Sequence, residues 1–125
     1  RWNGTRWMRS PTLAEYKLDH WQDIKDKRLG AEAGGFVWSL DTFESDVDSQ
    51  QRITMFAMRA QRLPASTVRW TLADNTSRLL SAADMLAVAD ALTAHLDAVH
   101  TTARQLRAQL VAATTRAEVD AVVWP

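Results

Sequence analysis

The acidic stretch DTFESDVDSQQR is the first place in the chain where side chains could do chemistry, because Glu44, Asp46 and Asp48 alternate along it. Two such carboxylates are the groups that hydrolyse a glycosidic bond as acid and base, and several together bind calcium. The stretch lacks the glycine and the terminal glutamate of an EF-hand loop. We therefore favour a simpler interpretation, in which these acids are solvated and precede the start of a helix. Hydrolysis by Asp46 and Asp48 stays open as an alternative.

Other groups that bind metals or attack substrates are sparse. His95 and His100 are five residues apart and miss the four-residue spacing that places two ligands on one helical face. His20 and Asp23 have a three-residue spacing, but no third ligand stands out in the sequence. The chain has no cysteine and no G-x-S-x-G, phosphate-binding or dinucleotide-binding glycine motif. We therefore predict no catalytic residue, no metal site and no cofactor, and a protein that is not an enzyme.

The charge of the chain is balanced, since 15 basic and 15 acidic residues give a formal net charge of +0. Nucleic-acid binding needs a basic surplus, so this balance argues against nucleic acid as a main partner. One alternative is a local basic cluster, with the members Arg59, Arg62, Arg69 and Arg78. A protein near neutrality also lacks the repulsion that keeps monomers apart, so we expect association. No run approaches the roughly 18 apolar residues that span a membrane.

Two of the six tryptophans lie at the start of the chain, in RWNGTRWMRS. Asn3-Gly4 is typical of a two-residue hairpin turn, because both turn positions need a positive φ. Trp2 and Trp7 then lie on one face of the hairpin and form an apolar plate. This plate either covers the domain's own core or docks onto a neighbouring chain, since tryptophan is enriched at the centre of interfaces.

Hydrophobic period and capping residues predict the elements that follow. A first helix spans about residues 12–33, and a short hairpin over residues 36–43 turns near Leu40, Asp41 and Thr42. Asp48 or Ser49 caps a second helix, which ends at Leu63 and Pro64. A second hairpin spans residues 68–80, and the two hairpins are expected to pair into one small sheet, because an isolated hairpin is only marginally stable.

Capping patterns predict the last two helices. Ser81 and Asp84 resemble a capping box and begin a long heptad-patterned helix over about residues 81–113, and Thr115 and Glu118 begin a short one. The fold class is therefore α+β, a small domain of three main helices plus a short terminal helix packed with two β-hairpins. We expect residues 11–125 to form a single domain and residues 1–10 to be the end of an upstream segment.

Apolar side chains in the long helix recur with spacings of four and three over nearly four heptads. They are Met85, Ala89, Leu92, Leu96, Val99, Ala103, Leu106 and Leu110. The flanking positions carry almost no complementary charge pairs, which favours packing of this seam within one chain. The alternative is a dimer or trimer. The candidate interface residues are therefore Trp2, Trp7, Met85, Leu92, Leu96, Val99, Leu106 and Leu110.

Several segments together resemble a known family. They are IKDKRLGAEAGGFVWSLDTFESDVDSQQRI, then VRWTLADNTSRLLSAADMLAVADALTAHLDAVHTTARQLRAQL, then AATTRAEVDAVVW. Their order is similar to a domain of unknown function found in tail-associated proteins of bacteriophages and prophages, and the resemblance covers residues 16–124. That family has no established catalytic residues, so none is carried over.

The resemblance implies a structural or adaptor component of a phage tail, such as a tail fibre, baseplate or minor tail protein. Its partners would be other tail proteins, and its location would be the virion, with the host cytoplasm during assembly. A tail-fibre assembly chaperone that is absent from the mature virion is one alternative. A hydrolase that degrades the host envelope is an alternative of another class.

Overall fold

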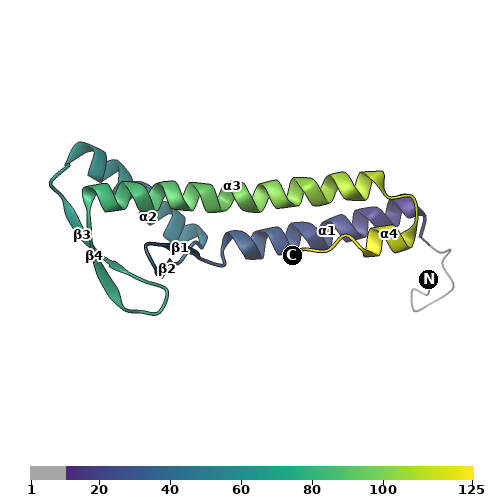
Figure 1. The fold of residues 1–125 in the computed structure, drawn as a ribbon, viewed down its shortest axis with the longest axis horizontal. Helices are drawn as coiled ribbons and strands as arrows, with labels where there is room; N and C mark the ends of the chain where they lie inside the picture. The colour runs from purple at the N-terminus through teal and green to yellow at the C-terminus, as the bar shows by residue number, and fades with distance from the viewer. Residues whose placement is uncertain (1–10) are drawn as a thin grey trace. The chain divides into compact units, whose positions relative to one another are not determined.

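The computed structural model describes residues 11–125 (Figure 1). It has the predicted α+β class, with four helices and two antiparallel hairpins among these residues. The elements are α1 (Leu13–Glu32), β1 (Phe36–Trp38), β2 (Asp41–Phe43), α2 (Val47–Arg62), β3 (Thr67–Thr71), β4 (Ser77–Ser81), α3 (Ala82–Ala112) and α4 (Arg116–Asp120).

The described residues divide into two compact units. We call residues 29–99 the hairpin unit, because both hairpins lie in it, and residues 11–28 with 100–125 the terminal unit. Helix α3 contributes its residues up to Val99 to the hairpin unit and the rest to the terminal unit. Each unit has its own hydrophobic core. The single domain over residues 11–125 stays a prediction.

The two hairpins form two separate two-stranded sheets, so the prediction of one small sheet is wrong. In the first, Phe36 pairs with Phe43, and in the second, Thr67 pairs with Ser81. A shared sheet would need a ladder of backbone hydrogen bonds between strands of different hairpins. The backbone bond described between them is instead a single one, from the Ala73 N–H in the loop of the second hairpin to the Thr42 carbonyl in β2 at 3.0 Å.

The N-cap of helix α2 is Asp46, two residues before Asp48 and three before Ser49, the two predicted caps. Asp46 has an extended backbone, and its carboxylate accepts a hydrogen bond from the hydroxyl of the buried Ser49. Asp48 and Ser49, the predicted caps, lie in the first turn of the helix. The predicted end is confirmed, with Leu63 as C-cap before Pro64.

The core of the hairpin unit brings together α2, both hairpins and the first half of α3. Phe36 stacks on Phe43 with ring centroids 5.6 Å apart, and Phe56 meets Trp70 edge-on at 5.6 Å. Such aromatic pairs stabilise a core beyond the area that they bury. The stacking of Phe36 on Phe43 also helps to hold β1 and β2 together, which have only three residues each.

Ser45 connects the end of α1 to the first hairpin. Its hydroxyl donates to the Glu32 carbonyl at 2.5 Å and accepts from the Gly35 N–H at 2.9 Å. The Ser45 side chain is fully buried, so both backbone groups depend on it for a partner. Gly35 has a φ of +92°, and a Cβ there would lie 3.1 Å from the Phe43 carbonyl oxygen. Only glycine fits this approach without strain.

Capping contacts begin the last two helices as predicted. The Ser81 N–H and the Asp84 carboxylate are 3.0 Å apart, and the Asp84 N–H donates to the Ser81 hydroxyl at 3.0 Å, which is a reciprocal capping box. The Glu118 N–H donates to the Thr115 hydroxyl at 3.2 Å. In the terminal unit, α4 is fixed to α1 by a hydrogen bond from the Tyr16 hydroxyl to Asp120.

Residues of the heptad seam pack into the chain's own two cores. Met85 and Leu92 are buried in the core of the hairpin unit, and the half-buried Leu96 packs against it. Leu106 and Leu110 are buried in the core of the terminal unit. The dimer or trimer stays a prediction.

Candidate interaction site

The tip of the first hairpin carries the most exposed large apolar side chain that the structure describes. Leu40 is 98% exposed and follows Ser39 in the two-residue turn between β1 and β2. Both turn residues have a positive φ, 49° for Ser39 and 70° for Leu40. This is the left-handed conformation that a two-residue hairpin turn needs. The turn therefore directs a leucine into solvent.

Neither residue type favours this conformation. Such turns are usually built from Asn-Gly or Gly-Gly, because a side chain with a Cβ costs roughly 1–2 kcal/mol in the left-handed region. Leu40 also leaves its apolar surface in water, which contributes nothing to the core. The chain thus keeps an unfavourable residue in an unfavourable backbone conformation, and other contacts must hold it there.

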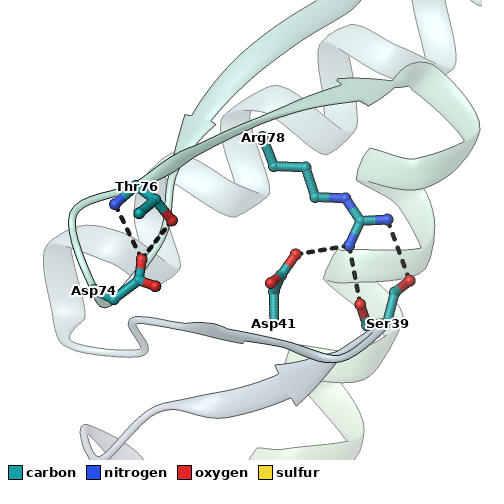
Figure 2. Close-up of polar contacts among 5 residues, drawn as sticks. All are labelled: Ser39, Asp41, Asp74, Thr76 and Arg78. Atoms are coloured by element: carbon teal, nitrogen blue, oxygen red, sulfur yellow. Dashed lines mark hydrogen bonds and ion pairs between the residues drawn. The ribbon is translucent and has the colours of Figure 1, made fainter.

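Arg78 supplies these contacts from β4 of the other hairpin (Figure 2). Its Nη1 donates to the Ser39 carbonyl at 3.0 Å and to Asp41 Oδ2 at 2.9 Å, and its Nη2 donates to Ser39 Oγ at 3.1 Å. The guanidinium also lies over the Trp38 ring, 4.8 Å from the centroid. The residues on both sides of Leu40 are therefore fixed by one cation. We call Ser39, Leu40, Asp41 and Arg78 the clamped tip.

The loop of the second hairpin is held by its own polar contacts, also drawn in Figure 2. Asp74 Oδ1 accepts from the Thr76 N–H at 3.0 Å and from the Thr76 hydroxyl at 2.6 Å. These bonds favour the ionised carboxylate, and the hydroxyl is the larger cause that lowers the pKa of Asp74. Asn75 occupies the left-handed position here with a φ of 66°, which asparagine tolerates well.

The clamped tip is suited to binding rather than to reaction. Its charged groups, Arg78 and Asp41, are paired with each other, and Arg78 also donates to the Ser39 carbonyl. What it offers to solvent is an isobutyl group on a fixed backbone. Because the backbone beside Leu40 is already held, a partner that covers this side chain need not order the turn, which favours association.

The predicted interface residues fall into two groups. Trp2 and Trp7 lie outside the described residues, and their docking role stays a prediction. The seam residues are mostly buried, and they are Met85, Leu92, Leu96, Val99, Leu106 and Leu110. Sequence analysis missed Leu40 as a site residue. The signal was present, since a leucine at a hairpin turn without asparagine or glycine breaks the turn preference.

The residues considered for chemistry do not form a metal site or a pair of catalytic carboxylates among the described residues. His20 and Asp23 line one pocket of the terminal unit, where Lys27 is the other charged residue. Asp46 is engaged as the cap of α2, and its hydrogen bond from Ser49 is the main cause that lowers its pKa. In the part of the chain that the structure describes, no three histidine or acidic side chains gather where they could hold a metal ion. Nor is any helix over residues 11–125 both long and apolar enough to cross a bilayer.

Three of the four arginines considered as a basic cluster, Arg59, Arg69 and Arg78, have different local partners. Arg78 belongs to the clamped tip. Arg59 donates to the Thr67 carbonyl at 3.4 Å, and Arg69 donates to the Ser77 hydroxyl at 3.3 Å. These contacts provide no support for nucleic-acid binding.

Together these features define a small α+β domain with an apolar residue presented on a clamped hairpin. Residues 15–123 match the family described as a domain of unknown function (DUF4376), and the chain belongs to that family. No curated protein and no solved structure matches the chain.

Proposed function

We propose that this protein is a non-enzymatic structural or adaptor component of a bacteriophage tail that acts through protein–protein contacts. Its sequence segments resemble a domain of tail-associated phage proteins, which supports the viral context. Its partners are then other tail proteins, in the virion and, during assembly, in the host cytoplasm.

The observation that carries the contact role is the clamped tip. Leu40 is fully exposed in a left-handed conformation, and Arg78 holds the backbone beside it. A turn selected for stability alone would carry asparagine or glycine at this position. Strained residues that the surrounding structure holds in place are concentrated at binding and switch sites. Leu40 is therefore the residue that enters an apolar pocket of the partner.

Site-specific photo-crosslinking tests this contact directly. A photoreactive amino acid replaces Leu40 in the full chain. The variant is produced in cells that assemble the phage particles to which the chain is proposed to belong. The matched control replaces Leu63, which is also exposed but lies at the end of α2. We expect a discrete adduct with one tail protein from position 40 and none from position 63. Equal, diffuse adducts from both positions, or adducts with no tail protein, would contradict the proposal.

A further inference from the structure

The terminal unit has an apolar groove between α1 and the second half of α3, with a volume of about 270 Å³. These two helical segments lie side by side (Figure 1). The groove has a floor and walls of apolar side chains, which include Leu18, Trp21, Leu110 and Val111. Leu110 is buried, but Leu18 is 63% and Val111 is 68% exposed. The apolar lining of the groove therefore extends from the buried core of the unit to its surface.

The charged residues that line this groove are both basic. They are Lys17 and Arg107, and none of the acidic side chains among residues 11–125 lines it. The Arg107 guanidinium lies over the Trp21 ring at 4.8 Å from the centroid, so it stands directly over the apolar wall. Lys17 donates to the Val111 carbonyl at 3.2 Å, so its ammonium group is partly engaged within the chain. Arg107 is therefore the stronger source of positive charge at the groove.

Pairs of helices leave grooves that the ridge of a third helix can fill. The recurring form of such recognition is an amphipathic helix that lays its apolar stripe into the groove. A partner helix for this groove needs acidic side chains beside the stripe, because Lys17 and Arg107 stand at its walls. Charge complementarity thus selects one kind of helix among many apolar ones.

We infer that the groove of Leu18, Trp21, Val111 and Arg107 is a docking site for an amphipathic helix of a partner protein, with acidic residues flanking its apolar stripe. The inference rests on the proposed adaptor function, because an adaptor joins two partners and needs a second surface. It uses none of the residues of the clamped tip. One surface can therefore be lost by substitution while the other is retained.

A peptide titration tests the inference with the full chain. The probe is a synthetic peptide of about 18 residues, long enough to form a helix when docked, with leucines along one face and glutamates on both sides of them. We expect Leu18→Asp to weaken its binding by about tenfold or more, since the aspartate faces the apolar stripe. The matched control is Leu29→Asp, on the same helix and 60% exposed, but outside the groove. It should leave the affinity unchanged within about twofold.

Reversing the charge at position 107 distinguishes specific docking from non-specific hydrophobic binding. Arg107→Glu should weaken binding of the glutamate-flanked peptide and strengthen binding of the same peptide with lysines in place of the glutamates. Circular dichroism of each variant confirms that the helices are retained. Absence of binding by the unmodified chain would overturn the inference, as would equal losses from Leu18→Asp and Leu29→Asp.

Two other occupants are outcomes of the same experiment. If Trp2→Ala with Trp7→Ala makes the peptide bind more tightly, the chain's own first residues compete for the groove, and the inference is wrong. If light scattering shows a dimer that Leu18→Asp converts to a monomer, a second copy fills the groove, and the inference is again wrong. The two proposals can fail separately. If the chain binds the peptide but gives no specific adduct at position 40, the groove remains a docking site and the contact role of the clamped tip is wrong.

Discussion

The guanidinium of Arg78 holds the backbone and the hydroxyl of Ser39, 39 residues away, through two hydrogen bonds of 3.0 and 3.1 Å. This contact joins two hairpins that share no sheet. It fixes the residue directly before Leu40, so a tertiary contact sets the direction of the most exposed apolar side chain described. Stability and presentation of the tip therefore depend on the same arginine.

Arg78→Ala should lower the free energy of unfolding by about 1–2 kcal/mol, because it leaves Asp41 and the Ser39 carbonyl without their donor at a partly exposed site. Urea denaturation measures this change. Arg69→Ala is the control, since Arg69 makes one long side-chain bond on the neighbouring strand. Its effect should stay within about 0.5 kcal/mol. Equal losses of stability from the two substitutions would contradict the claim that the Arg78 contacts hold the first hairpin turn.

Leu40→Asn should stabilise the protein by about 0.5–1 kcal/mol, because asparagine adopts the left-handed conformation more readily. The same change should abolish the partner contact, since the apolar group is gone. Thermal unfolding and the yield of assembled particles measure the two effects. Leu79→Asn, at an exposed strand position with no positive φ, should give no such gain. A Leu40→Asn protein that is less stable than the parent would refute the strain argument.

Ser45→Ala should destabilise the hairpin unit by about 1–3 kcal/mol, because the Glu32 carbonyl and the Gly35 N–H both lose a buried partner. Amide hydrogen exchange should report faster exchange at Gly35. The exposed Ser77 provides the comparison, and Ser77→Ala should leave exchange at Gly35 as it is. Unchanged protection in Ser45→Ala would show that water replaces the hydroxyl without loss.

The start of α2 should weaken in acid. The hydroxyl of Ser49, the first of several causes, holds the pKa of Asp46 below its ordinary value of 3.8. A lowered pKa in the folded state means that the ionised carboxylate stabilises the fold above pH 3.8, and that this contribution is lost as the pH falls through the folded-state pKa. Ser49→Ala should return the pKa of Asp46 toward 3.8, measured by carboxyl NMR titration. A titration that Ser49→Ala leaves unmoved would assign the shift to another cause.

Local pattern was enough to predict most of the elements. Ser81 with Asp84 and Thr115 with Glu118 begin their helices as the sequence indicates, because capping is a contact between residues three apart. The start of α2 was misplaced because Asp46, Asp48 and Ser49 satisfy the same preference, and only the backbone conformation selects among them.

Contacts between distant segments were beyond prediction. The two hairpins are joined by Arg78 and by the bond from Ala73 to Thr42, and no local pattern encodes these contacts. The heptad seam predicted burial correctly but left its partner open, since cores within a chain and interfaces between chains use the same spacing. The first turn was predicted near Leu40, Asp41 and Thr42, whereas Ser39 and Leu40 form it. The exposure of Leu40 was therefore missed, although a leucine in such a turn is unusual.

The most direct measurement is the abundance of this chain in purified tailed particles, by quantitative mass spectrometry, for the parent sequence and for Leu40→Asp. We predict a fixed ratio of the chain to the other tail proteins in the parent particles and depletion of the chain in the Leu40→Asp particles. A chain that contributes to assembly yet is absent from the particles would favour the assembly chaperone. Full incorporation of Leu40→Asp would contradict the role of the clamped tip.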